Sequence, residues 1–290
     1  MRTVVVGRGA WGSAFGGLMR DHGHEVTWVG REDVEAHVWE TAELVVLAVP
    51  SRAFRSVLER VGGTAPILSL VKGLDPATGE RLSTLVHDRP VAVLSGPNMA
   101  EEVLAGLPGA TVIASHDEQL ALHLQEALTS RAFRVYVNDD VVGVELCGAA
   151  KNVIALAAGG VDGLGLGDNA KAALITRGLV EMARLGEAFG AQPETFSGLA
   201  GMGDLMVSCF HASGRNRRAG ELIARGATPD EARAEIGQAV EGLTTAPVLR
   251  DLSRRIGVEL PITEGVCSIL EGRPLHELAA SLMGRRPTEE

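Results

Sequence analysis

The sequence predicts an α/β protein in which a doubly wound, mostly parallel sheet is followed by an all-helical region. Short apolar runs alternate with helical patterns in the first half of the 290-residue chain, whereas β-like runs are absent after Asn138. A glycine-rich turn, Gly7 to Gly12, follows the first strand-like run directly. We therefore expect two domains, a Rossmann-like one at 1–138 and a helical one at 139–290.

The strands of the predicted sheet are short runs of aliphatic and β-branched residues. Most of these runs are apolar at every position rather than at alternate ones, which is typical of strands buried on both faces of a parallel sheet. In chain order they cover residues 3–7, 25–29, 44–49, 67–70, 91–94, 110–114 and 134–137.

Helical patterns connect most of these strands, because parallel neighbours require a crossover connection. In the first half they cover 11–21, 52–61, 79–86 and 117–128, and Glu101 with Glu102 should begin a further helix. After Asn138 the apolar residues recur with helical spacing only. The helices expected there are 141–158, 169–189, 216–225, 229–236, 244–256, 263–270 and 275–283.

Composition argues against several classes of protein. The formal net charge of −10 does not favour nucleic acid as a partner. We find no apolar run of the roughly 20 residues that span a bilayer, so membrane insertion is not expected. Cys147, Cys209 and Cys267 are too few and too widely spaced for a disulfide framework or a zinc site, and the histidines have no metal-ligand spacing. We expect a reduced, cytoplasmic protein without a metal.

The glycine-rich turn has the spacing G-x-G-x-x-G and lies between a strand and a helix. In a dinucleotide-binding unit Gly7 would make the tight turn, Gly9 would let a pyrophosphate approach the backbone, and Gly12 would let helix and strand pack closely. The N–H groups of the helix start would then face the phosphates. We interpret this turn as a dinucleotide site rather than a purely structural turn.

The end of the second strand bears on the choice between NAD(H) and NADP(H). NAD-specific sites normally have Asp or Glu there, but this chain has Val29, Gly30 and Arg31. An arginine suits a 2′-phosphate, so NADP(H) is favoured, with NAD(H) as the alternative because Glu32 and Asp33 follow directly. The other interpretation of Arg31 is a solvated surface charge.

Lysine is rare in this chain, since only Lys72, Lys151 and Lys171 occur among 27 basic residues. Lysines that persist where arginine serves elsewhere are candidates for work that requires the release of a proton. Lys151 lies with Asn152 inside the apolar segment VELCGAAKNVIALAAG, where small neighbours leave room for a ligand. Asn152 would orient a substrate hydroxyl or carbonyl, and Lys171 would support the site from outside.

A second polar segment is LAGMGDLMVSCFHASGRNRRAG. Asp204 follows three closely spaced glycines, whose turns would direct its carboxylate to one point. Arg215 and Asn216 begin a helix, which combines a guanidinium with free N–H groups and therefore suits an anion. We expect Arg217 and Arg218, by contrast, to form a solvated basic face.

These segments resemble those of bacterial NAD(P)-dependent glycerol-3-phosphate dehydrogenases over nearly the whole chain. The resemblance implies reversible, NAD(P)H-dependent reduction of dihydroxyacetone phosphate to sn-glycerol 3-phosphate, which supplies the backbone for phospholipid synthesis. The helical domain would then bind the substrate and carry the catalytic lysine. The matching segments are GRGAWG, LAVPSRAF, VKGLDPATGERL, SGPNMAEEV, VELCGAAKNVIALAAG, GDNAKAALITRG, LAGMGDL, GRNRRAG and VEGLTTA.

The resemblance and the motifs together assign roles to individual residues. Lys151 would be the general acid and base, assisted by Lys72 and Asp204. Substrate contacts would come from Lys72, Gly96, Asn98, Lys151, Asn152, Asp204, Ser208, Gly214, Arg215 and Asn216. Cofactor contacts would come from Gly7, Gly9, Ala10, Trp11, Gly12, Arg31, Lys72, Ala100, Arg215 and Glu241.

One stretch departs from the family pattern. Between the second strand and the segment LVVLAVP, relatives have several dozen residues more than the stretch 30–43 of this chain. Those residues normally form a helix and an edge strand beside the adenine. We expect the departure to affect adenine affinity and the choice between NAD and NADP, and not the reaction.

The residues fit the reaction that the resemblance implies. Arg215 and the N–H groups beside it would hold the substrate phosphate, and Lys151 would donate a proton to the developing alkoxide. Asp204 would keep Lys151 in place and still able to exchange its proton. The alternatives are a hydroxyacid dehydrogenase of the 3-hydroxyisobutyrate or 6-phosphogluconate type and a non-catalytic NADP(H)-sensing module. A homodimer through the helical domain is a further expectation.

Overall fold

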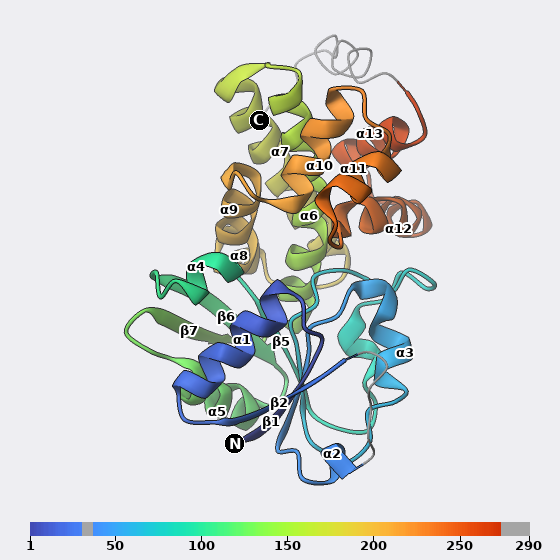
Figure 1. The fold of residues 1–290 in the computed structure, drawn as a ribbon. Helices are drawn as coiled ribbons and strands as arrows, with labels where there is room; N and C mark the ends of the chain where they lie inside the picture. Colours follow the sequence, from blue (N-terminus) through green and yellow to red (C-terminus); the bar gives the residue numbers. More distant parts are fainter. Residues whose placement is uncertain (31–36, 274–290) are drawn as a thin grey trace.

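The structure is a computed structural model of the chain, and it describes residues 1–30 and 37–273. A sheet with flanking helices forms one end of the molecule and a group of helices forms the other (Figure 1). The predicted fold class is therefore confirmed. Arg31 and the helix expected at 275–283 lie outside the described residues.

Seven strands form one sheet in the order β2-β1-β3-β4-β5-β6-β7. Neighbouring strands are parallel except β5 and β6, which are antiparallel, so the sheet is mostly parallel as predicted. Strands β2 and β7 are its edges. The strands are β1 (Arg2–Val6), β2 (Glu25–Val29), β3 (Leu44–Leu47), β4 (Ile67–Ser69), β5 (Val91–Ser95), β6 (Gly109–Ser115) and β7 (Phe133–Asn138).

Helices cover both faces of the sheet. On one face, α1 (Ala10–Asp21) and α5 (Glu118–Leu128) bury Phe15 and Leu124 among strand residues, and α4 (Ala100–Leu104) packs beside α1. On the other face, Trp39, Phe54 and Leu82 belong to one buried cluster. The elements that cover this face are α2 (His37–Glu40), the short 3-10 helix η1 (Ser51–Ala53), α3 (Phe54–Leu58) and the 3-10 helix η2 (Leu82–Leu85).

The helix expected at 79–86 is wrong in extent, because only the 3-10 turn η2 forms there. The chain before it makes a tight loop in which Asp75 N donates to Glu80 O at 2.9 Å, and Leu74 and Arg81 form a β-bridge. Gly79 has a φ of +75°, which a helix cannot include. Long-range packing of Leu82, rather than helical periodicity, fixes this segment.

Helix α6 (Val141–Gly163) is the core of the helical half. It packs against α7 (Gly167–Ala188), α9 (Asp204–Phe210), α10 (Arg215–Ala224) and α12 (Glu241–Ile256), and it also contacts β5 and β6 (Figure 1). The remaining elements are α8 (Pro193–Ser197), the π-helical turn η3 (Leu199–Gly203), α11 (Pro229–Ile236) and α13 (Pro261–Leu270).

By length and composition alone α6 could cross a membrane, because an 18-residue window has a mean hydropathy of 1.6. The expectation that no apolar run is long enough was therefore wrong for this helix. In the structure 89% of that window is buried against the rest of the protein. The apolar composition of α6 is explained by its place in the core.

Helices α6 and α10 touch through their backbones. A Cβ atom on Gly159 would lie 1.7 Å from Arg217 O, and a Cβ atom on Gly220 would lie 1.8 Å from Leu156 O. No side chain fits between the two helices at this crossing. The contact fixes how far the start of α10 lies from α6.

Candidate active site

The site forms where the carboxyl ends of the parallel strands face the helical half. Strands β1, β3, β4 and β5 run in the same direction, so the residues that follow them gather at the carboxyl end of the sheet. These residues include Gly7, Ser51, Lys72 and Gly96. Helix α6 contacts β5 and so brings Lys151 to the same carboxyl end of the sheet.

A buried carboxylate joins the two lysines. Asp204, the first residue of α9, accepts hydrogen bonds from Lys72 Nζ at 2.6 Å and from Lys151 Nζ at 2.8 Å. Lys151 Nζ also donates to Ser208 Oγ at 2.6 Å, and Lys72 Nζ donates to Asn98 Oδ1 at 3.3 Å. We call these five residues the Asp204 cluster. It unites Lys72, Asn98, Lys151, Asp204 and Ser208 from four separate segments, as the sequence predicted for a common site.

Burial and charge compete inside the Asp204 cluster. Asp204 is 2% exposed and Lys151 is 7% exposed. Burial disfavours the charged carboxylate, but the Lys151 and Lys72 ammonium groups outweigh it and hold the pKa of Asp204 below its usual range. Burial lowers the pKa of Lys72 to about 8, against the opposing effect of Asp204. Lys72 therefore titrates close to neutral pH.

Polar groups that sequence reasoning missed support the cluster from β5 and β6. Ser95 Oγ donates to Asp204 Oδ2 at 3.2 Å. Thr111 Oγ1 accepts from Asn98 Nδ2 at 2.9 Å and donates to Ser95 O at 3.0 Å. Gly96 O accepts from Lys72 Nζ at 3.3 Å. Ser and Thr inside a buried strand are common, so only the antiparallel pairing of β5 with β6 reveals that Ser95 and Thr111 face the cluster.

The two asparagines bind protein groups in the structure. Asn152 Nδ2 donates to Lys72 O at 3.0 Å, and Asn152 Oδ1 accepts from Asn216 Nδ2 at 2.8 Å. Asn216 Oδ1 in turn accepts from Gly242 N at 2.8 Å. This series of amides ties α6, α10 and the start of α12 to the loop that carries Lys72.

The segment around Asp204 differs from the expected geometry, whereas Arg215 and Asn216 begin a helix as predicted. Gly201 and Gly203 lie in the π-helical turn η3, with Gly198 as its N-cap, and η3 continues into α9. Gly214 is the N-cap of α10, and no side chain caps this helix. Arg215 is exposed there, with its Nη1 donating to Ala239 O at 3.0 Å. The N–H groups at the start of α10, together with this guanidinium, are donors of the kind that can bind an anion.

The expectation of a solvated basic face is wrong for Arg217. Its side chain is only 14% exposed, and its Nη1 donates to Asp162 Oδ2 at 2.6 Å. Arg218, by contrast, has a side chain that is 49% exposed and forms a surface ion pair with Glu235. The difference arises because α10 packs on the C-terminal part of α6, where Asp162 lies.

The glycine turn fits a dinucleotide. Gly7 has a φ of +109°, and a Cβ atom there would lie 2.4 Å from Ala48 O. A Cβ atom on Gly12 would lie 2.3 Å from Gly7 O. A Cβ atom on Gly9, however, would meet no atom of the described residues within 4 Å. These residues give no steric reason for Gly9, so its missing side chain leaves room for a ligand at the start of α1.

Several other expected cofactor residues lie at the starts of helices near the carboxyl end of the sheet. Ala10 begins α1 and Ala100 begins α4. Trp11 is half-buried, and its indole N–H has no hydrogen-bond partner among the described residues. Glu241, the first residue of α12, accepts a hydrogen bond from Ser51 Oγ at 2.6 Å and thereby connects the helical half to the end of β3.

Arg8 is a further residue that sequence reasoning missed. It occupies the variable position between Gly7 and Gly9, and its Nη2 donates to Trp28 O at 3.1 Å. This bond holds a guanidinium at the carboxyl end of β2, where dinucleotide folds meet the adenosine ribose. The signal was present in the sequence, since an arginine inside the G-x-G turn is a long cation in a position that small residues can fill.

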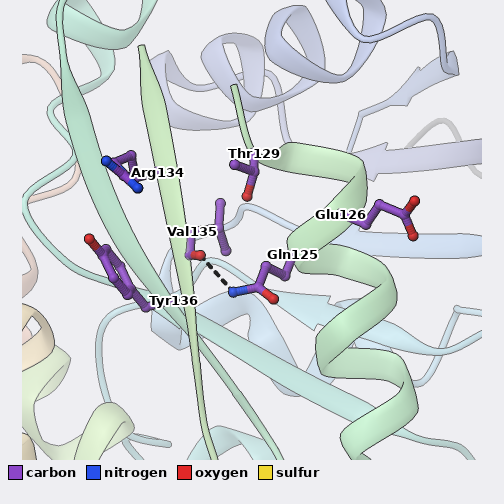
Figure 2. Close-up of a pocket in the computed structure, with 6 residues that line it drawn as sticks. All are labelled: Gln125, Glu126, Thr129, Arg134, Val135 and Tyr136. Carbon is purple, nitrogen blue, oxygen red and sulfur yellow. Dashed lines mark hydrogen bonds between the residues drawn. The ribbon is translucent and has the colours of Figure 1, made fainter. Parts of the chain in front are cut away.

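Two cavities of the structure lie away from the Asp204 cluster. One of about 420 Å³ lies between α5 and the edge strand β7 (Figure 2). Its lining residues are Gln125, Glu126, Thr129, Arg134, Val135 and Tyr136. Another of about 200 Å³ lies beside α12 and α13.

Comparison with known proteins identifies the family. Residues 140–279 match the model of the NAD-dependent glycerol-3-phosphate dehydrogenase C-terminus, and residues 33–121 match that of its N-terminus. A glycerol-3-phosphate dehydrogenase [NAD(P)+] of Gloeobacter violaceus is 44% identical over 302 residues, covering 100% of this chain and 99% of the relative. One of Macrococcus caseolyticus is 37% identical over 331 residues, covering 100% of both chains.

A solved structure agrees with these sequence matches. The crystal structure of glycerol-3-phosphate dehydrogenase from Coxiella burnetii has a TM-score of 0.93 and 35% identity, and the match covers 98% of this chain and 99% of that one. The alignment of 331 positions with the M. caseolyticus protein also means that this relative has residues without counterparts in the 290-residue chain. The chain therefore belongs to the NAD-dependent glycerol-3-phosphate dehydrogenase family.

Proposed function

We propose that the Asp204 cluster is the catalytic centre of this protein, which reduces dihydroxyacetone phosphate to sn-glycerol 3-phosphate with NAD(P)H. Relatives matched over the whole chain carry the name glycerol-3-phosphate dehydrogenase [NAD(P)+], which supports the reaction and the cofactor. The observation that carries the proposal is the buried amine of Lys151, held by Asp204 and Ser208 beside Lys72. Such an ammonium can deliver a proton where little water is present.

Lys151 is the proposed general acid and base. When bound, NAD(P)H supplies a hydride to the carbonyl carbon of the substrate. Lys151 Nζ donates a proton to the carbonyl oxygen, so that the carbonyl becomes a secondary alcohol, and the neutral amine removes this proton in the reverse direction. Asp204 and Ser208 orient Nζ. An arginine at this position would stay protonated and could not exchange the proton.

Lys72 is proposed to stabilise the developing negative charge on the substrate oxygen. It shares Asp204 with Lys151, and its Nζ also contacts Gly96 O and Asn98 Oδ1. Both ammonium groups therefore lie at the same carboxylate. A second fixed cation at an alkoxide lowers the barrier by electrostatic stabilisation.

The start of α10 is proposed to bind the substrate phosphate. Gly214 leaves the first N–H groups of the helix uncapped, and Arg215 adds an exposed guanidinium. Fixing the phosphate there would hold the substrate carbonyl at Lys151. Substrate contacts by Asn152 and Asn216 stay predictions, because their amides bind protein groups in this structure.

The cofactor is proposed to lie along the carboxyl ends of the strands. Its pyrophosphate would approach Gly9 at the start of α1, with Gly7, Ala10, Trp11, Gly12 and Ala100 around it. Glu241 and Arg215 would contact its nicotinamide end from the helical half. NADP(H) is the favoured form, because arginines rather than an acid stand near the end of β2, Arg8 in the structure and Arg31 in the sequence.

The preference for NADP(H) can be tested through Arg8. We expect Arg8→Ala to weaken NADP⁺ binding about tenfold and leave NAD⁺ binding within about twofold, since a hydrogen bond to a phosphate is worth roughly 1.5–3 kcal/mol. Calorimetric titration with each nucleotide measures both constants. Arg134→Ala removes the same charge from β7, at the opposite edge of the sheet, and serves as the control. Equal losses for both nucleotides in Arg8→Ala would exclude a contact with the 2′-phosphate.

Loss of NADPH absorbance on addition of dihydroxyacetone phosphate tests the reaction itself. We expect turnover with this substrate and much less with 3-hydroxyisobutyrate or 6-phosphogluconate plus NADP⁺. Turnover only with a carboxylate substrate would favour the hydroxyacid dehydrogenase alternative. Cofactor binding without turnover of any of the three would favour a sensing module.

Several coarser features complete the proposal. The substrate is a small molecule, and the boundary between domains 1–138 and 139–290 is supported by the end of β7 at Asn138 and the start of α6 at Val141. A cytoplasmic location agrees with three cysteines that are free and buried, Cys147, Cys209 and Cys267. The homodimer stays a prediction.

A further inference from the structure

A second carboxylate receives two cations at the far end of α6. Asp162 Oδ2 accepts from Lys171 Nζ at 2.8 Å and from Arg217 Nη1 at 2.6 Å. We call Asp162, Lys171 and Arg217 the Asp162 cluster. Asp162 follows Lys151 by about three helical turns, so this cluster lies beyond the Asp204 cluster along the same helix.

Arg217 uses its other nitrogens to hold the loop between α9 and α10. Its Nε donates to His211 O at 3.1 Å, and its Nη2 donates to Ala212 O at 3.0 Å. Gly214 N also donates to His211 O, at 3.0 Å. The planar guanidinium therefore fixes two loop carbonyls and Asp162 at once, which an ammonium could not do.

Lys171 contacts the residue that directly precedes this loop. Its Nζ lies 4.8 Å from the ring centroid of Phe210, the last residue of α9. The Lys171 side chain is only 7% exposed, so this cation is held between Asp162 and the Phe210 ring. The Asp162 cluster thus contacts the end of α9, the loop and the first turn of α10.

The loop held in this way separates the two ends of the proposed substrate site. Before it, α9 carries Asp204 and Ser208, which bind the Lys151 amine. After it, α10 begins with Gly214 and Arg215, at the proposed phosphate site. The path of only a few loop residues therefore sets where the anion site lies relative to the amine.

We infer that Arg217, held by Asp162 and Lys171, is a positioning residue for the substrate phosphate. Among the described residues its side chain forms no hydrogen bond with the cofactor turn or the Asp204 cluster, and it acts by fixing the loop that leads to Gly214 and Arg215. The inference rests on the proposed function, since it assigns the start of α10 to the phosphate of dihydroxyacetone phosphate. Loss of Arg217 would then affect substrate binding more than cofactor binding.

The test compares Arg217→Ala with Arg218→Ala, the neighbouring arginine whose ion pair with Glu235 lies on the surface. We expect Arg217→Ala to raise KM for dihydroxyacetone phosphate about tenfold or more, with NADPH affinity within about twofold of the unchanged protein. Arg217→Lys should recover little, because one ammonium cannot replace the guanidinium fork. Arg218→Ala should change KM by less than about twofold.

Binding of inorganic phosphate, measured by calorimetry, is a readout that does not need turnover. We expect it to weaken in Arg217→Ala in parallel with KM. If Arg217→Ala fails to fold, Asp162→Asn should show the same change in KM to a smaller extent. Unchanged KM and phosphate affinity in the folded variants, or equal effects in Arg217→Ala and Arg218→Ala, would overturn the inference.

The proposed function can fail separately. A chain that binds phosphate and loses this binding in Arg217→Ala, yet never reduces dihydroxyacetone phosphate, would support the anion site and reject the reaction. Arg217→Ala and Arg217→Lys could instead have the KM and phosphate affinity of the unchanged protein, with only the melting temperature of Arg217→Ala lowered. That result would mean that Arg217 only stabilises the fold.

Discussion

The Asp204 and Asp162 clusters have the same charge pattern in two different settings. Each has one carboxylate that accepts from two cations, Lys72 and Lys151 in the first and Lys171 and Arg217 in the second. The Asp204 side chain is 3% exposed, whereas that of Asp162 is 24% exposed. Two ammonium groups meet at Asp204, and a guanidinium replaces one of them at Asp162.

The difference teaches what each cluster can do. A lysine pair around a buried carboxylate contains groups that can exchange protons, as the pKa of about 8 for Lys72 indicates. A guanidinium stays charged and directs its donors in a fixed plane, so Arg217 in the Asp162 cluster can hold structure but cannot exchange a proton. An ion pair alone therefore does not indicate a catalytic site. The identity of the cation and its other partners indicate whether the site can be catalytic.

The largest expected effect separates the two clusters through their lysines. Lys151→Ala should lower kcat by about 10²–10⁴-fold or more with cofactor affinity retained, since a general acid contributes about that much. Lys171→Ala removes the same group from the other carboxylate and should lower kcat by less than about tenfold. Steady-state kinetics and NADPH titration measure both. Similar losses of kcat in the two variants would break the comparison.

The next effect concerns the pH dependence of the Asp204 cluster. Lys72 is protonated below a pKa of about 8, so kcat/KM for reduction should fall as pH rises through this value. Lys72→Arg keeps its charge and should move this fall to higher pH, at a lower overall rate. A pH profile of each protein with dihydroxyacetone phosphate measures the shift. A fall at the same pH in both proteins would assign it to another group.

The same pKa has a consequence for stability. Because the folded value for Lys72 lies below its ordinary 10.5, the unfolded chain binds more protons between about pH 8 and 10.5. The contribution of Lys72 to the free energy of unfolding therefore rises with pH across this window. Urea unfolding of the protein and of Lys72→Met at both ends of the window checks the sign, since the difference between them should shift in favour of the lysine.

The smallest effect is at the Asp162 carboxylate. Hydrogen bonds from Lys171 and Arg217 overcome the opposing effect of burial and lower its pKa. Asp162→Asn should cost about 1–3 kcal/mol of unfolding free energy at pH 7. The gap should close as pH falls from about 4, the ordinary pKa of the carboxyl group, through the lowered pKa of Asp162 in the folded protein.

Urea unfolding at several pH values measures this gap. Asp251→Asn on the exposed face of α12 is the control and should stay within about 0.5 kcal/mol of the unchanged protein. A gap that persists at acidic pH would mean that Asp162 contributes by packing rather than by charge.

Much of the fold followed from the sequence, because its signals are local. The strands are continuous apolar runs and the glycine turn has fixed spacing, so β2 and α11 have their predicted bounds. The lysines of the Asp204 cluster also followed, since lysine is scarce in this chain. What failed depended on distant partners. Arg217 faces Asp162 from another helix, and η2 forms in place of the expected longer helix where Leu82 packs into a cluster of distant residues.

The crossing of α6 and α10 at Gly159 and Gly220 has a consequence for how this enzyme can evolve. Main-chain atoms, rather than side chains, set the span between Lys151 on one helix and the start of the other. Ordinary substitutions therefore have no gradual way to tune that span. A single methyl group would separate the helices and disturb both carboxylates together. The distance between Lys151 and the start of α10 should therefore change far more slowly in evolution than the surrounding residues.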